Sequence, residues 1–142
     1  MKHGMHDREA FVVAGRETRA SNDDPSPIGA LWSAIYDDPA IRALGADDEP
    51  MIAAYCEYEG DHTQPYTFFL GRRVAADAEI PDGLVRREIP AGRYAVYLAE
   101  GPMPAKLIET WGTIWEAPLE RRFDVDYEIH REPTLVEVYV GA

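Results

Sequence analysis

The stretch WGTIWEAPLERRFDVDYEIH, residues 111–130, contains the pattern that most constrains the architecture of this chain. Trp111 and Trp115 stand at positions i and i+4, so a helix places both indole rings on one face. A short turn follows this predicted helix and leads into a predicted strand that carries Asp126 and Glu128. Aromatic faces close to a carboxylate suit a bulky organic cation, because a cation over a ring face gains roughly 0.5 to 2 kcal/mol.

The predicted strand in this stretch has two open interpretations. Alternation separates charged side chains from apolar ones. One face would carry Asp124, Asp126, Glu128 and His130, and the other Val125, Tyr127 and Ile129. The first interpretation is a ligand pocket beneath Glu128. The second is an apolar layer beneath Tyr127, with both tryptophans packed in the core and Glu128 in solvent.

Hydrophobic periodicity predicts the order strand, helix, strand, strand twice along the chain. The first half has predicted strands at 10–14, 51–59 and 66–75 and a predicted helix at 28–36. The second half has predicted strands at 86–100, 124–130 and 135–140, a bend at Pro90, and a helix between Pro104 and Pro118. Residues 1–8 are expected to be frayed and residues 40–50 to form a loop. We therefore predict one α+β domain over residues 1–142, with pseudo-repeats at about 9–76 and 85–141.

The two predicted halves also resemble each other in sequence. Trp32-Ser-Ala-Ile-Tyr36 matches Trp111-Gly-Thr-Ile-Trp115, Glu57-Tyr58 parallels Glu128-Ile129, and Phe68-Phe69-Leu70-Gly71 parallels Val138-Tyr139-Val140-Gly141. Such self-similarity indicates two equivalent modules. They would join into one antiparallel sheet that carries two main helices, with a central ligand groove where the modules meet.

Composition excludes several classes of protein. The 142 residues are 46% hydrophobic, which is typical of an ordered domain, and the single Cys56 rules out an internal disulfide. A formal charge of −12 repels nucleic-acid phosphates and anionic membranes, so we expect no direct nucleic-acid or membrane partner. The sequence shows no leader and no membrane-spanning run, which predicts a cytoplasmic location.

The sequence lacks the common motifs of cofactor and metal chemistry. Its four histidines do not form a ligand set with plausible spacing, and no phosphate-binding glycine motif or serine nucleophile motif occurs. Cys56 lies among aromatic residues on a predicted strand, where a packed and inert thiol is expected. We therefore expect no metal and no cofactor.

Several ordered segments together resemble a known family. They are VAGRETRASN, ALWSAIY, AAYCEYEGD leading to YTFFLGRRV, IPAGRYAVYLAEG, and W-x-x-I-W followed by DVDYEIH. From about Phe11 to Gly141 the chain is similar to the GyrI-like small-molecule-binding domain. Its stand-alone branch, the integron-cassette effector-binding proteins, matches best and is related to the effector domains of AraC-type and multidrug-responsive transcription regulators.

The resemblance implies that the chain binds hydrophobic, cationic aromatic compounds in the groove between the modules. Glu128 matches a glutamate near the floor of the groove, and Trp111 and Trp115 match aromatic wall positions. Further candidate ligand-binding residues are Tyr55, Glu57, Tyr94 and Tyr97. His130 stands where an aromatic residue, often tyrosine, is usual. The acidic charge and the short chain favour a free-standing sensor or sequestering protein with a possible protein partner over a DNA-binding regulator.

Two alternative functions follow from the same resemblance. Some GyrI-like proteins are thought to hydrolyse strained cyclic drugs with paired glutamates, and Glu57 and Glu128 would be that pair here. The founding relatives inhibit DNA gyrase, and an acidic surface that mimics DNA would suit such a protein-interaction inhibitor. The sequence offers no regular acidic stripe for the second alternative.

Overall fold

A computed structural model of the chain describes residues 3–35, 37–44, 50–60, 63–118 and 120–142. The elements in chain order are β1 (His3–Arg8), β2 (Phe11–Ala20), α1 (Ser26–Ile35), α2 (Pro39–Arg42), β3 (Met51–Cys56), β4 (Tyr66–Val74), β5 (Val85–Ile89), β6 (Gly92–Glu100), α3 (Ala105–Glu116), β7 (Val125–Glu132) and β8 (Leu135–Gly141). Within the described residues, no helix is long and apolar enough to cross a bilayer.

The eight strands form one antiparallel sheet in the order β1-β6-β8-β7-β3-β4-β2-β5. This order is symmetric about the β3–β7 pair, where Ala53 lies opposite Glu128. The unit β2-α1-β3-β4 lies on one side of the pair and the unit β6-α3-β7-β8 on the other. The predicted α+β fold, an antiparallel sheet with two main helices, is therefore confirmed.

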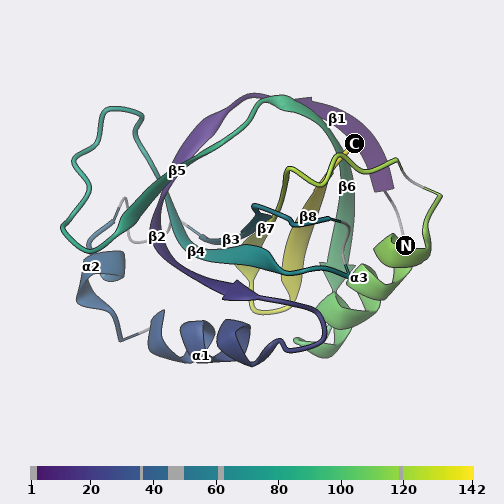
Figure 1. Ribbon diagram of the computed structural model, residues 1–142, viewed down its shortest axis with the longest axis horizontal. Helices are drawn as coiled ribbons and strands as arrows, with labels where there is room; N and C mark the ends of the chain where they lie inside the picture. Colours follow the sequence, from purple (N-terminus) through teal and green to yellow (C-terminus); the bar gives the residue numbers. More distant parts are fainter. Residues whose placement is uncertain (1–2, 36, 45–49, 61–62, 119) are drawn as a thin grey trace.

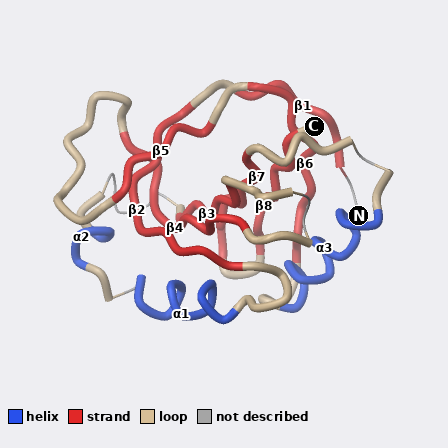
Figure 2. The backbone as a smooth tube through the Cα atoms, in the orientation of Figure 1, coloured by secondary structure: helices blue, strands red, loops and turns tan. Residues whose placement is uncertain are grey.

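Two long segments link the ends of the sheet and make it curl. Residues 3–8 pair with residues 92–97, and residues 11–15 pair with residues 85–89 in the same antiparallel sense. The two edge strands are β1 and β5. β1 is followed directly in the chain by β2, and β5 by β6. The segment β1–β2 therefore pairs with the segment β5–β6 at both edges of the sheet. The sheet accordingly bends into the ring-like outline of Figure 1, with both main helices along its outer side (Figures 1 and 2).

The curled sheet has apolar packing on both faces. The inner face carries a cluster that includes Phe11, Tyr94, Tyr127 and Tyr139. The outer face carries two clusters beneath the helices, one with Phe68 under α1 and one with Val138 under α3. Burial on both faces fixes the strand register, because a slip by one residue would exchange the two sets of side chains.

Several predicted boundaries were wrong. Residues His3–Arg8 are not frayed but form β1, because they supply backbone hydrogen-bond partners to the outer edge of β6. The first strand of the first module continues to Ala20. The predicted loop 40–50 contains the end of the short helix α2, which is capped by Asp38, while residues 45–49 lie outside the described residues. The predicted bend at Pro90 separates β5 from β6.

Candidate ligand-binding pocket

A pocket of about 460 Å³ opens between α1 and α3, over the central strands β3 and β7. Both helices and the loops that lead into them contribute apolar or aromatic side chains, and the strands contribute the polar floor. The lining residues are Asn22, Pro25, Ile28, Gly29, Trp32, Tyr55, Tyr58, Tyr66, Pro104, Leu107, Ile108, Trp111, Trp115, Arg121 and Glu128. The pocket thus lies where the two modules meet, as the repeat predicts.

Glu128 is the acidic residue of the lining, and its side chain is 1% exposed. Its Oε2 accepts hydrogen bonds from the Tyr55 hydroxyl and the Trp111 Nε1–H, each over 2.7 Å. Its Oε1 lies 2.9 Å from Nε2 of His130. In the described part of the chain no lysine or arginine pairs with this carboxylate. The carboxylate is satisfied by hydrogen bonds, and no permanent cation among the described residues balances it, which is unusual for a buried acid.

Aromatic rings surround the carboxylate. The Tyr55 ring lies 5.3 Å from the Trp111 ring and 5.5 Å from the Tyr66 ring, both edge to face. Trp32 of α1 packs on the imidazole of His130 with ring centroids 4.7 Å apart. Trp115 is 40% exposed at the pocket lining. A flat or multi-ring ligand would therefore find ring faces and edges on several sides of the pocket.

Two phenols of the pocket lining, Tyr55 and Tyr66, keep their protons over a wide pH range. Burial raises the pKa of Tyr55 well above its ordinary value, and the negative charge of Glu128 raises it further. Burial, followed by the charge of Glu128, raises the pKa of Tyr66 to about 12. Both phenols therefore stay neutral beside the Glu128 carboxylate, while Arg121, the cation of the lining, is paired with Asp126.

A second buried carboxylate, Asp126, lies two residues away on β7 and is 0% exposed. It pairs with Arg121 over 2.6 Å, accepts the Tyr58 hydroxyl, and accepts the backbone N–H of Gly141 over 2.8 Å. The Arg121 guanidinium stacks 4.3 Å from the centre of the Phe123 ring. The Arg121 cation balances the charge of Asp126, and the ion pair holds the loop before β7 against the sheet.

The structure places four of the seven predicted ligand-binding residues on the lining: Glu128, Trp111, Trp115 and Tyr55. The other three lie elsewhere. Tyr94 is in the inner core and donates its hydroxyl to the Pro90 carbonyl over 2.8 Å. Tyr97 is 2% exposed and packs in the cluster beneath α3. Glu57 is exposed, and its carboxylate binds Thr67 and Arg87.

The position of Glu57 has a local backbone cause. Strand β3 ends at Cys56, and Glu57 has a left-handed φ of 50°, which breaks the alternation of side chains at that residue. Tyr58 consequently lines the pocket, while the Thr67 hydroxyl and the Arg87 guanidinium hold Glu57 outside it and lower the pKa of its carboxyl group. Glu57 and Glu128 therefore do not form the carboxylate pair that the hydrolase alternative requires.

The strand register also corrects the predicted internal match of Glu57 with Glu128. Ala54 pairs with Phe69, and Tyr127 pairs with Tyr139. If Phe69 and Tyr139 are equivalent, the residue of the first module that corresponds to Glu128 is Tyr55. The hydrogen bond from Tyr55 to Glu128 thus joins equivalent positions of the two modules.

Eleven of the fifteen lining residues were absent from the sequence-based list, among them Trp32, Tyr58, Tyr66 and Arg121. The internal repeat could have found Trp32, since it matches Trp111, and the structure places both indoles on the lining. Tyr36, the match of Trp115, lies outside the described residues. No sequence pattern singled out Arg121, because its place depends on its ion pair with Asp126.

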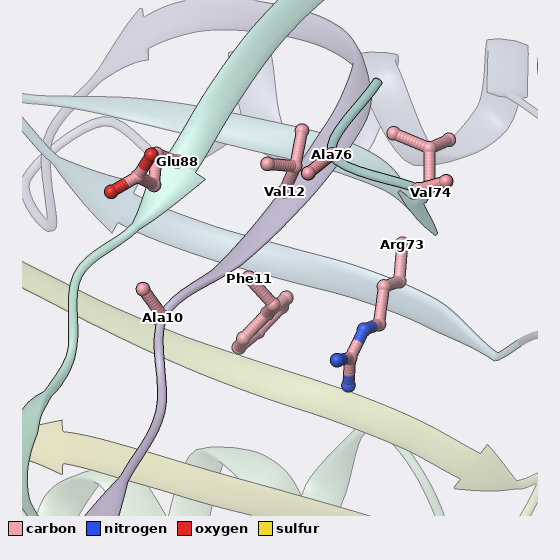
Figure 3. A pocket seen from close by; sticks show the side chains of 8 residues that line it. Ala10, Phe11, Val12, Arg73, Val74, Ala76 and Glu88 are labelled. Carbon is pink, nitrogen blue, oxygen red and sulfur yellow. The ribbon is translucent and has the colours of Figure 1, made fainter. Parts of the chain in front are cut away.

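Another pocket, of about 470 Å³, lies at the start of β2, the end of β4 and β5, around Phe11, Arg73 and Glu88 (Figure 3). Arg73 extends along the Phe11 ring, with its guanidinium carbon 4.9 Å from the ring centre. Both charged side chains of this pocket are exposed, and none of the predicted ligand-binding residues lines it. The pocket between α1 and α3 is therefore the stronger candidate.

Solved structures share this fold at low sequence identity. The integron cassette protein VCH_CASS2 of Vibrio cholerae superposes with a TM-score of 0.84 at 23% identity, over 98% of this chain and 94% of that one. The protein SAV2435, solved bound to tetraphenylphosphonium, superposes with a TM-score of 0.77 at 13% identity, over 99% of this chain and 93% of that one.

Sequence relatives include transcriptional regulators. The putative transcriptional regulator protein YobU of Bacillus subtilis is 30% identical over 87% of this chain and 82% of its own length. The transcriptional regulator BrlR of Pseudomonas aeruginosa is 27% identical over 87% of this chain, which spans 46% of BrlR. The profile of the Cass2 family, described as integron-associated effector binding protein, matches residues 5–141. The chain belongs to this family of integron-associated effector-binding proteins, whose small-molecule-binding fold is GyrI-like.

Proposed function

We propose that this chain binds hydrophobic, cationic aromatic small molecules in the pocket between α1 and α3, as a sensor or a sequestering protein. The observation that carries the proposal is the Glu128 carboxylate, 1% exposed and without a lysine or arginine partner among the described residues. A ligand cation would supply the missing charge while its rings pack on Trp111, Trp115 and Trp32. The tetraphenylphosphonium found with SAV2435, which shares the fold, is such a compound and supports this choice of ligand class.

Electrostatics and apolar contact act together in such a pocket. A cation near a buried carboxylate is screened less than one in water, and ring faces add roughly 0.5 to 2 kcal/mol per cation contact. Apolar ligand surface gains about 25 cal/mol for each Å² removed from water. Apolar contact favours ligands of any charge, whereas Glu128 favours cations, so charge selectivity tests the role of Glu128 separately from hydrophobicity.

The experiment compares two ions of nearly equal shape, tetraphenylphosphonium and tetraphenylborate, by tryptophan fluorescence titration at pH 8. We expect the cation to bind and the anion to bind at least about tenfold more weakly, which corresponds to about 1.4 kcal/mol. Glu128→Gln should weaken cation binding about 10- to 100-fold, because the countercharge is lost while the shape is kept.

The matched control is Glu116→Gln, which removes one negative charge from an exposed position of α3 outside the pocket lining. Its cation affinity should remain within about twofold of the parent, because an exposed charge is screened by salt. Equal binding of the two ions, or equal effects of the two substitutions, would show that Glu128 is not the countercharge.

A further inference from the structure

His130 contacts the Glu128 carboxylate but is not among the residues that line the pocket. Its Nε2 lies 2.9 Å from Oε1 of Glu128, and its side chain is 21% exposed. The ring packs against Trp32 of α1, with centroids 4.7 Å apart. Oε2 of Glu128 is meanwhile held by Tyr55 and Trp111. The two oxygens thus have different partners, neutral donors on one and an imidazole on the other.

The other groups around this pair come from every packed element. Tyr55 of β3, Tyr66 of β4 and Trp111 of α3 face Glu128, and Trp32 of α1 faces His130. The strand neighbours of His130 are Met51 on β3 and Val136 on β8, both uncharged. Among the described residues, Arg121 on the pocket lining pairs with Asp126 and Arg131 pairs with Glu137. The guanidinium of Arg72 on β4 donates to the Leu44 carbonyl over 3.3 Å.

Imidazole differs from the other described groups that contact Glu128, because it can take up a second proton and become a cation, whereas a phenol and an indole cannot. An ionised carboxylate accepts hydrogen bonds and does not donate them, so the 2.9 Å contact assigns the hydrogen to Nε2. A second proton would then bind at Nδ1, and the contact with Glu128 would persist as an ion pair. Protonation thus changes the charge of the pair without breaking its hydrogen bond.

We propose that His130 determines which ligand charge the pocket accepts, because a proton on His130 and a cationic ligand compete for Glu128. This inference rests on the proposed function. With neutral imidazole, the Glu128–His130 pair carries one negative charge and favours a cation. With imidazolium, the pair is neutral and the pocket favours an uncharged aromatic ligand. By linkage, binding of a cation must release a proton wherever His130 is charged in the free protein.

The test follows tetraphenylphosphonium binding by calorimetry and fluorescence from pH 5.5 to pH 8. For the parent protein we expect affinity to fall toward acid, by up to about tenfold per pH unit, as one linked proton dictates. Calorimetry in two buffers of different ionisation enthalpy should detect up to one proton released per cation bound in the acidic part of this range. A neutral probe, triphenylphosphine oxide, should bind no more weakly at pH 5.5 than at pH 8.

His130→Gln is the matched variant, because its side-chain amide can donate a hydrogen bond to Oε1 of Glu128 but does not titrate. We expect its cation affinity to change much less than that of the parent between pH 8 and pH 5.5. His130→Phe is the second variant and keeps a ring against Trp32. Proton release is measured on the parent protein, so this result does not depend on whether a variant folds.

The outcomes separate this inference from the proposed function. If tetraphenylphosphonium binds at pH 8 but the parent and His130→Gln share one pH dependence, His130 is not the competing group and the proposed function stands. The same holds if the parent releases no proton at any pH while binding the cation. If the cation does not bind at any pH, both proposals fail.

Discussion

Two carboxylates on the same face of β7, Asp126 and Glu128, are both buried and yet have opposite surroundings. Asp126 has a permanent cation, because Arg121 pairs with it over 2.6 Å. Glu128 has no lysine or arginine among the described residues and is held by Tyr55, Trp111 and His130. Each carboxylate also accepts one phenol, from Tyr58 and Tyr55 respectively.

The difference separates a buried charge that belongs to the fold from one that we propose for the ligand site. Removing one partner of a buried ion pair leaves the other charge without compensation, so the Asp126–Arg121 pair is tied to stability. Glu128 is held by neutral donors and an imidazole instead, and we propose that a ligand cation balances its charge. The same strand thus carries a structural charge and, two residues further along, the carboxylate that we propose as the ligand's countercharge.

The largest expected effect is on stability, from Asp126→Asn. We expect its free energy of unfolding to fall by about 3 to 5 kcal/mol, because Arg121 stays buried without its anion. Glu128→Gln should change the free energy of unfolding by no more than about 1 kcal/mol, because the amide oxygen still accepts hydrogen bonds. Urea unfolding at pH 7 measures both.

The control is the double variant Asp126→Asn with Arg121→Met. It removes both charges and should recover much of the stability that Asp126→Asn alone loses. Equal losses for Asp126→Asn and Glu128→Gln, with no recovery in the double variant, would contradict the distinction between the two carboxylates.

Much of the fold was predictable because it follows from periodicity and from the internal repeat. The order strand, helix, strand, strand twice over leads directly to the mirrored strand order around β3 and β7. The apolar layer beneath Tyr127 and the pocket beneath Glu128 are both present, whereas the interpretation that placed Glu128 in solvent is wrong. Tyr127 packs in the inner core and Glu128 faces the pocket, because the curled sheet is covered on both faces.

The misses among the candidate site residues have a physical cause as well. Regular alternation along β3 would put Glu57 on the same face as Tyr55, but the left-handed backbone of Glu57 at the end of β3 prevents this. Glutamate gives no sequence signal for a positive φ, in contrast to glycine or asparagine. Tyr94 and Tyr97 are buried aromatics whose place beneath or inside the sheet depends on contacts between distant strands, which composition does not reveal.

A smaller effect is expected from the two phenols that bind the carboxylates. Tyr58→Phe and Tyr55→Phe should each lower the free energy of unfolding by about 1.5 to 3 kcal/mol, because each removes a hydrogen bond to a charged group. Their effects on tetraphenylphosphonium binding should differ. Tyr58→Phe should leave the affinity within about twofold, since Asp126 keeps Arg121.

Tyr55→Phe should strengthen cation binding by about two- to fivefold, because the hydroxyl dipole no longer offsets the charge of Glu128. Urea unfolding and fluorescence titration of both variants test this pair of predictions. A larger change in cation affinity for Tyr58→Phe than for Tyr55→Phe would assign the ligand countercharge to Asp126 instead.

The smallest expected effect is a loss of stability at alkaline pH, and it involves the phenol that is bound to each carboxylate. Burial first, and then the adjacent carboxylate, raises the pKa of Tyr55 and of Tyr58 well above the ordinary value of 10.0. Between that ordinary value and the pKa of the folded state, the unfolded chain loses the phenol proton while the folded chain keeps it. The stabilisation that each neutral phenol contributes is therefore fully present below about pH 10. Above that pH, the free energy of unfolding falls by about 1.4 kcal/mol per pH unit for each such phenol.

In urea unfolding between pH 9 and pH 11.5, Tyr55→Phe and Tyr58→Phe should each show a shallower fall than the parent by that amount, since phenylalanine has no proton to lose. A fall as steep as that of the parent in either variant would mean that the phenol in question ionises alike in the folded and unfolded chains, and that its carboxylate does not hold it as a donor.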